Sequence, residues 1–121
     1  MVNETAHCAG GLTMNICLSY GSRGEFVHVC QSIAKDVERK RLRHEDIQES
    51  TISDRMLTRH CPDPDIVIRT SGEYRISNFL LWQLAYSEFF FLSKPWPAIE
   101  KADLVQIIRD FANGRKRRYG K

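Results

Sequence analysis

The chain has 121 residues, of which 42% are hydrophobic and 27% are charged, and its formal net charge is +3. These values indicate one domain at most and are ordinary for a soluble globular protein. No membrane-spanning segment is expected, because the longest apolar stretch, residues 79–92, is interrupted by polar residues and is too short to cross a bilayer. The small positive excess is compatible with a phosphorylated substrate or an anionic membrane surface, and it requires neither.

The cysteines and residues 1–10 bear on the cellular compartment of the protein. None of the four cysteines forms a C-x-x-C pair, which favours an intracellular, reduced protein that we expect to be cytoplasmic. Two pairs, His7-Cys8 and His60-Cys61, leave a zinc site as an alternative, although their spacing matches no standard finger. Residues 1–10 lack the apolar region of a signal peptide.

The first element that we expect is a strand over residues 12–20, because hydrophobic residues alternate there. A glycine-rich turn follows, and hydrophobic residues then recur at helical spacing over residues 24–43. The charge cluster at residues 38–44 fits a solvated helix end better than a nucleic-acid patch. Further on, we expect a short helix around residues 53–60, which two prolines end.

A strand, a basic loop and a helix follow in the second half. Residues 66–68 have the β-branched composition of a strand buried on both faces, and Arg69 ends it. Turn residues lead to a helix that we expect over residues 77–88, capped by Ser77 or Asn78. A further strand at 89–92 and an amphipathic helix at 103–116 complete the chain.

This alternation of strands and helices predicts an α/β fold with a parallel β-sheet flanked by helices. Three parallel strands would leave unprotected sheet edges, since such sheets usually carry more strands and helices on both faces. The order of elements therefore predicts an incomplete sheet, as part of a larger fold.

The basic loop, from Arg69 to Ser77, has the residue types of an anion site. Arg69 lies at the carboxyl end of a strand, where ligands bind in open α/β sheets. Arg75 and Ser77 lie at the expected helix entrance, where free N–H groups attract phosphate and guanidinium groups grip it bidentately. The alternatives are a salt bridge for Arg69, solvent exposure for Arg75 and a simple helix cap for Ser77.

Four motifs occur in order: LTMNICLSYGSRGE at residues 12–25, IRTSGEYRISNFLLWQLAYSE at 68–88, Trp96-Pro97, and a terminal Arg117-Arg118-Tyr119-Gly120. They resemble the signature of the cis-prenyltransferases, the family of undecaprenyl and dehydrodolichyl diphosphate synthases. The resemblance covers most of residues 11–120. Members are about twice as long, a common size for one α/β domain. Residues 1–121 are thus expected to be the carboxy-terminal part of a single domain, with the amino-terminal half absent.

The resemblance implies the cis-condensation of isopentenyl diphosphate onto an allylic diphosphate to make a polyprenyl diphosphate, a lipid carrier for glycan synthesis. It implies that Arg69, Arg75, Ile76 and Ser77 bind the diphosphate of isopentenyl diphosphate. Tyr74 stands where bacterial members often have histidine, which leaves the role of this position open. The lipid product implies a peripheral membrane contact, and no nucleic-acid partner is expected because the basic tail lacks interleaved aromatic residues.

The resemblance also assigns Glu88 to Mg²⁺, a hard cation that carboxylates suit. Glu88 follows Ser77 by 11 residues, which is about 16 Å along a continuous helix. Glu88 is therefore expected to serve a neighbouring site or the paired subunit, unless the helix bends back, and the alternative is a salt bridge with a basic residue. Arg118 and Gly120 match a motif that in paired members reaches the neighbour's diphosphate site, so the full-length form is expected to be a homodimer.

The family's leading Asp-Gly-Asn motif does not occur in the sequence. Its aspartate binds Mg²⁺ beside the allylic diphosphate, so this chain is expected to hold no catalytic residue and to be inactive alone. The alternative is a non-catalytic partner subunit that lends Arg118 and Gly120 to another chain. The chain retains Arg69, Arg75, Ser77 and Glu88, which we call the diphosphate clamp together with its expected metal ligand. Their retention argues against that alternative, since a partner need not keep a complete clamp.

Overall fold

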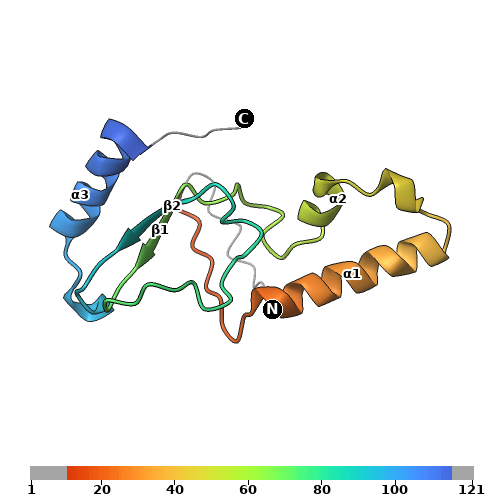
Figure 1. Ribbon diagram of the computed structural model, residues 1–121, viewed down its shortest axis with the longest axis horizontal. Helices are drawn as coiled ribbons and strands as arrows, with labels where there is room; N and C mark the ends of the chain where they lie inside the picture. The colour runs from red at the N-terminus through yellow and green to blue at the C-terminus, as the bar shows by residue number, and fades with distance from the viewer. Residues whose placement is uncertain (1–10, 116–121) are drawn as a thin grey trace.

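The structure is a computed structural model that describes residues 11–115, so the expected roles of Arg118 and Gly120 lie outside the described residues. Figure 1 shows the sheet and the last helix at one end of the molecule and the first two helices at the other. The helices and strands, in chain order, are α1 (Ser22–Glu38), α2 (Glu49–Ser53), β1 (Ile66–Arg69), β2 (Glu88–Phe91) and α3 (Lys101–Asp110). Short 3-10 turns lie at His44–Asp46 and Trp96–Ala98, and a π-helical turn at Phe111–Arg115 extends α3.

The predicted parallel sheet is confirmed. β1 and β2 pair in parallel, with Ile66 opposite Glu88 and Arg69 opposite Phe91. Phe90 on β2 and Ile107 on α3 are both buried. A cavity of about 420 Å³ lies between the two elements, lined by residues of β2 and by Asp103 and Ile107 of α3.

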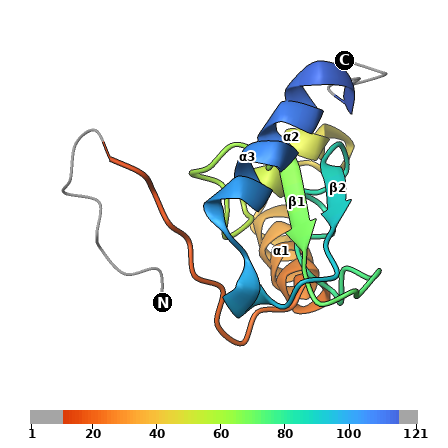
Figure 2. The ribbon, with the colours of Figure 1, turned by 90° about the vertical axis from the view of Figure 1, so that its left-hand side faces the viewer.

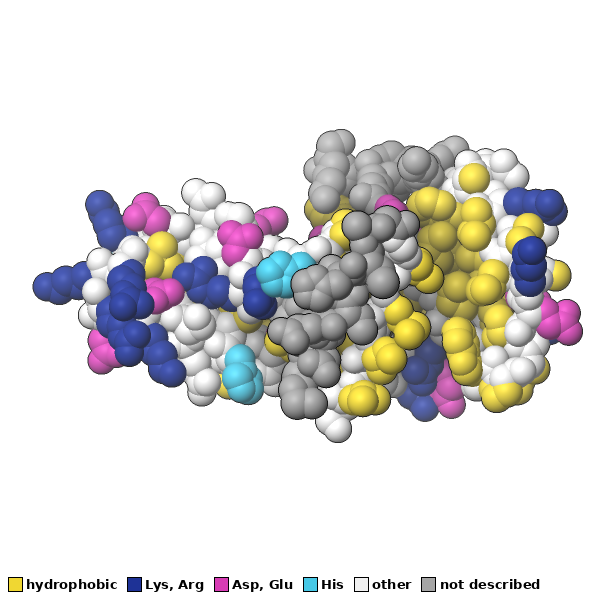
Figure 3. Space-filling model, turned by 180° about the vertical axis from the view of Figure 1, so that it is seen from behind, with side chains coloured by type: hydrophobic (Ala, Val, Ile, Leu, Met, Phe, Trp, Pro, Cys, Tyr) yellow, Lys and Arg dark blue, Asp and Glu magenta, His cyan; other side chains and the backbone are white. Residues whose placement is uncertain are grey.

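The strand expected at residues 12–20 does not form, so the described residues hold a sheet of two strands instead of three. Figure 2 shows this segment running apart from β1 and β2. Four of its five alternating hydrophobic side chains lie in solvent, with Leu12 98% and Leu18 83% exposed, and only Tyr20 at its end is half-buried. The alternation is typical of a half-buried strand, but a strand needs a hydrogen-bonded neighbour and a covered apolar face. Figure 3 shows further hydrophobic side chains on the surface at the end of the molecule that holds the sheet.

The helix expected at residues 77–88 is also absent, because residues 77–86 form turns. Ser77, Asn78 and Leu80 have φ values of 47°, 63° and 46°, which lie in the left-handed region and cannot begin an α-helix. One helical hydrogen bond remains, from Leu84 N–H to Leu80 O at 3.0 Å. Glu88 consequently begins β2 instead of ending a helix.

The first and last helices are confirmed with shifted bounds, whereas the short helix expected around residues 53–60 is wrong, because residues 54–60 form turns. The first runs over Ser22–Glu38 instead of 24–43, and Lys40 after it has a φ of 56°. A short helix forms just before that range instead, at Glu49–Ser53, where the Thr51 hydroxyl accepts the Gln48 N–H at 3.1 Å at the helix start. The third begins at Lys101, where the Asp103 carboxylate accepts the Glu100 N–H at 2.9 Å.

The main hydrophobic core joins α1 to the segments after α2 and after the basic loop. Val29 and Ile33 of α1 pack with Met56, which is 1% exposed. Trp82 packs against this group, meets the Phe26 ring edge-on at 5.8 Å and donates a hydrogen bond to Ser53 Oγ at 3.0 Å. None of the helices within residues 11–115 is both long and apolar enough to span a membrane.

Candidate functional site

Arg69 lies at the carboxyl end of β1, as the sequence predicts. Its backbone oxygen accepts the Leu92 N–H at 2.8 Å, which continues the pairing of the sheet past β2. Its side chain is half-buried, and its Nε atom is buried without a hydrogen-bond partner among the described residues. A buried guanidinium N–H without an acceptor is unfavourable. Arg69 therefore offers a desolvated, positively charged donor at the edge where ligands of open α/β sheets bind.

The loop after Arg69 is fixed to the segment that follows β2. Ser71 N–H donates to Lys94 O and Gly72 N–H donates to Leu92 O, each at 2.9 Å. Ser71 and Gly72 have φ values of 67° and 66°, the left-handed geometry of a tight turn. Since two hydrogen bonds join this turn to the segment after β2, the start of the basic loop is anchored beside the sheet.

Arg75 lies on the solvent side of the loop. Its guanidinium forms an ion pair with Glu73, and 67% of its side chain is exposed. This position matches the alternative of solvent exposure, with a carboxylate of the same loop as partner. Tyr74 between them is 77% exposed and lies with its ring centre 5.2 Å from that of Phe91.

Ser77 is exposed in the turn, and the half-buried Ile76 precedes it. Because no helix begins here, Ser77 caps nothing and the loop gains no helix N-terminus to attract an anion. No hydrogen bond or ion pair of the described chain joins Arg69, Arg75 and Ser77, and neither of the two described cavities is lined by them. Their convergence on one anion remains a prediction.

Asn78 has a contact that the sequence did not indicate. Its side-chain oxygen accepts the Arg23 N–H at 2.9 Å, and its backbone oxygen accepts the Ser22 N–H at 2.8 Å. Asn78 thus caps α1 from 55 residues away. The signal in the sequence was Gly21, since a helix that begins after glycine lacks a local side-chain cap and needs another acceptor.

Glu25 is a second residue that sequence reasoning missed. It is 7% exposed, and its carboxylate accepts the Leu57 N–H at 2.7 Å and the Tyr20 hydroxyl at 2.5 Å. The amide of Gln83 also donates to it at 3.4 Å. Buried carboxylates need such partners, so Glu25 ties α1 to the segments after α2 and after the basic loop.

Glu88 lies at the opposite end of the sheet from Arg69. It pairs in register with Ile66 at the amino end of β1, and its N–H donates to Asp65 O at 2.9 Å. Three residue steps along a strand separate this position from Arg69 in the sheet, about 10 Å. The separation of Glu88 from Ser77 was expected from a continuous helix, and that helix does not form. A role for Glu88 at a neighbouring site or in a paired subunit therefore stays a prediction.

The residues that the structure describes do not form a magnesium site by themselves. Within the described ranges, no group of three or more histidine, cysteine, aspartate or glutamate side chains could hold a metal ion. Glu88 offers one carboxylate, and Mg²⁺ is commonly bound by one or two carboxylates together with phosphate oxygens and water. For the alternative zinc site, His7 and Cys8 lie outside the described residues.

Comparison with known proteins places the whole chain in one group. A family model described as "Putative undecaprenyl diphosphate synthase" matches residues 1–120. The isoprenyl transferase of Listeria monocytogenes serotype 4b (strain F2365) is 44% identical over 119 residues, which are 98% of this chain and 46% of that protein. The isoprenyl transferase of Streptococcus thermophilus (strain CNRZ 1066) is 49% identical over 123 residues, covering 98% of this chain and 49% of that protein.

A solved structure shows the same fold. The crystal structure of lavandulyl diphosphate synthase from Lavandula x intermedia, in complex with dimethylallyl diphosphate, matches with a TM-score of 0.76 and 39% sequence identity. The match covers 85% of this chain and 43% of that one. The chain thus spans about half the length of the curated relatives and the solved structure that it matches.

Proposed function

The chain belongs to the prenyltransferase family of undecaprenyl diphosphate synthase, and from this we propose that it carries the isopentenyl diphosphate site of a cis-prenyltransferase. The complete enzyme would condense isopentenyl diphosphate onto an allylic diphosphate and lengthen a polyprenyl diphosphate. Residues 1–121 would be the carboxy-terminal part of that single domain and would not turn over substrate alone.

The observation that carries the proposal is the Nε atom of Arg69, buried without a partner at the carboxyl end of β1. A phosphate oxygen would give this N–H its acceptor and form a charge-assisted hydrogen bond, among the strongest in proteins. The strand and the pinned loop hold the residue in place before the ligand arrives, which lowers the entropic cost of binding.

Arg75 and Ser77 would complete the clamp from the same loop. The Arg75–Glu73 pair is exposed, and such surface pairs contribute about 0–1 kcal/mol. A diphosphate carries more charge than one carboxylate, so it can draw the Arg75 guanidinium away from Glu73. The Ser77 hydroxyl would donate to the same group, with Ile76 setting the spacing of the two side chains.

The clamp positions an anion and moves no proton. Its task in the reaction is to orient isopentenyl diphosphate so that its double bond faces the allylic carbon, which lowers the barrier through proximity. Glu88 remains a proposed Mg²⁺ ligand for a neighbouring site or for a paired subunit. The full-length form is proposed to be a homodimer. A cytoplasmic location with membrane contact through the lipid product completes the proposal.

Calorimetric titration of this chain with isopentenyl diphosphate tests the proposal. We expect saturable binding, no binding of isopentenol, and a loss of at least about tenfold in affinity for Arg69→Gln, because a charged hydrogen bond is removed. Arg109→Gln is the matched control, since Arg109 is an exposed arginine of α3. Equal affinity of the two variants would contradict the clamp. Incorporation of radiolabelled isopentenyl units by the chain alone would contradict its inactivity.

A further inference from the structure

The start of α1 and the loop that carries Ser77 are joined directly. Asn78 accepts two N–H groups of α1, from Ser22 at 2.8 Å and from Arg23 at 2.9 Å. In return, Ser22 Oγ accepts the Leu81 N–H at 3.0 Å, and Ser22 is completely buried. We call these four residues the Asn78 clasp.

The helix depends on the clasp because its own sequence supplies no cap. The first N–H groups of an α-helix have no partner within the helix, and Gly21 at the N-cap position has no side chain to accept one. Asn78 supplies both missing acceptors. In turn, α1 packs through Val29 and Ile33 into the main core, so the clasp connects the loop to that core.

The loop depends on the clasp because its backbone is strained. Ser77 and Leu80 lie in the left-handed region, with φ values of 47° and 46°, which residues with a Cβ atom rarely adopt. Such geometry persists only where surrounding contacts fix it. The clasp holds Asn78, between these two residues, to the buried start of α1.

The two segments also touch closely. A Cβ atom at Gly21 would lie 2.8 Å from Asn78 Nδ2, nearer than real Cβ atoms approach. A Cβ atom at Gly24, one turn further along α1, would meet nothing within 4 Å. Alanine at position 21 would therefore displace the Asn78 side chain, whereas alanine at position 24 would displace nothing.

We propose that the Asn78 clasp positions Ser77, and through the same loop Arg75, for the diphosphate of the substrate. Asn78 is then a positioning residue that acts through its neighbour, and the start of α1 belongs to the site without touching the ligand. This inference rests on the proposed function. It adds that contacts at the start of α1 determine the affinity of the clamp for the diphosphate. Without the clasp, the loop would populate other backbone conformations, and the diphosphate would have to select the competent one.

The matched pair Gly21→Ala and Gly24→Ala tests the clasp by sterics alone. Isopentenyl diphosphate affinity is measured by calorimetry well below the melting temperature of each variant. We expect Gly21→Ala to lose about tenfold in affinity because the loop is no longer pre-organised, and Gly24→Ala to stay within about twofold. Amide hydrogen exchange at residues 77–81 should become faster in Gly21→Ala only. A merely structural clasp would lower the melting temperature and leave the affinity of the folded protein unchanged.

The outcomes distinguish the positioning role of the clasp from the proposed isopentenyl diphosphate site. Binding by the wild type with equal affinity in Gly21→Ala overturns the positioning role and leaves the proposed function standing. Absence of wild-type binding overturns both. Should Gly21→Ala fail to fold, Asn78→Gly decides in its place, because glycine accepts the φ of 63° and removes only the side-chain bond to Arg23. Affinity within twofold of the wild type in that variant would overturn the positioning role of the Asn78 side chain.

Discussion

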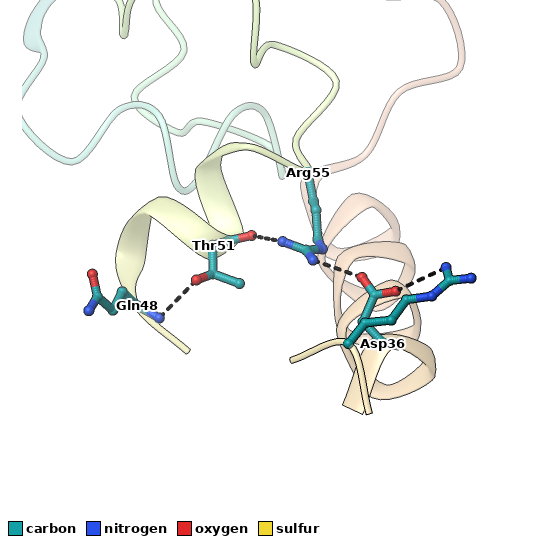
Figure 4. A network of polar contacts seen from close by, with 5 residues as sticks. Asp36, Gln48, Thr51 and Arg55 are labelled. Atoms are coloured by element: carbon teal, nitrogen blue, oxygen red, sulfur yellow. Dashed lines mark hydrogen bonds and ion pairs between the residues drawn. The ribbon is translucent and has the colours of Figure 1, made fainter. Parts of the chain in front are cut away.

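The guanidinium of Arg55 donates a hydrogen bond to the carboxylate of Asp36 at 2.8 Å and joins the turn after α2 to α1 (Figure 4). Arg55 also donates to the backbone oxygen of Thr51 at 2.8 Å, so one side chain links α2, its following turn and α1. Both members of the ion pair are half-buried, with 25% of each side chain exposed. Because such pairs are screened less than fully exposed ones, we expect this one to stabilise the helical end of the molecule.

The first prediction concerns acid pH. The hydrogen bond from Arg55, more than the charges of Arg55 and Arg41, holds the pKa of the Asp36 carboxyl below its ordinary value. Such a carboxyl stabilises the fold above its unfolded pKa, and this contribution is lost as pH falls through the folded pKa. Asp36→Asn should therefore be less stable than the wild type at pH 7, and the difference should close below about pH 4. Urea unfolding at several pH values measures it.

A double-mutant cycle provides the control. In an Arg55→Gln background the partner is gone, so Asp36→Asn should cost less stability than it does in the wild type, and the pH dependence of its effect should weaken. An Asp36→Asn effect that is the same in both backgrounds would show that the pair does not contribute.

The second prediction concerns the main core and uses two adjacent residues. Met56 is 1% exposed and packs with Val29 and Ile33, whereas 56% of Leu57 is exposed. Met56→Ala should lower the free energy of unfolding by about 2–5 kcal/mol, because it removes buried contacts and leaves a cavity. Leu57→Ala should change it by about 0.5 kcal/mol or less. Denaturant unfolding distinguishes them, and similar losses in both variants would place the core elsewhere.

Elements with a strong local pattern were predictable from the sequence. The β-branched run before Arg69 and the aromatic run after Glu88 both form strands, and the helical spacing of apolar residues identified α1 and α3. The position of Arg69 at a strand end followed directly, since it depends only on where β1 stops. Helix bounds shifted because caps such as the Thr51 hydroxyl, close in the chain, decide them.

Features that depend on distant partners were not predictable. Residues 12–20 have a strand pattern, but no sheet edge of the described residues pairs with them. The helix expected after Ser77 is replaced by turns, because Asn78 gives its acceptor groups to α1 instead of capping its own segment. Likewise, the Arg75 guanidinium could face solvent, a carboxylate or a ligand, and residue spacing does not decide which. In the structure its partner is Glu73.

The third prediction follows from that pairing. Glu73→Gln removes the carboxylate that holds Arg75 at the surface, so the guanidinium becomes free to bind a diphosphate. Affinity for isopentenyl diphosphate should rise by up to about fivefold, the equivalent of an exposed ion pair. Calorimetry measures the change. The control is Glu38→Gln at the far end of α1, which makes the same charge change away from the loop. An equal gain in both variants would indicate only a general charge effect.

The fourth prediction concerns alkaline pH and the contact between Tyr20 and Glu25. Burial, and then the hydrogen bond to the Glu25 carboxylate at 2.5 Å, raise the pKa of Tyr20 to about 12. A tyrosine whose pKa is higher in the folded chain stabilises the fold fully below the unfolded pKa of about 10, and this contribution is lost as pH rises through the folded value. Tyr20→Phe should therefore be less stable than the wild type at pH 8, and the two stabilities should converge between pH 10 and 12.

Tyr74→Phe is the control, because Tyr74 is 77% exposed. Denaturant unfolding across this range decides, and a constant difference up to pH 12 would show that the Tyr20 hydroxyl is not held by Glu25.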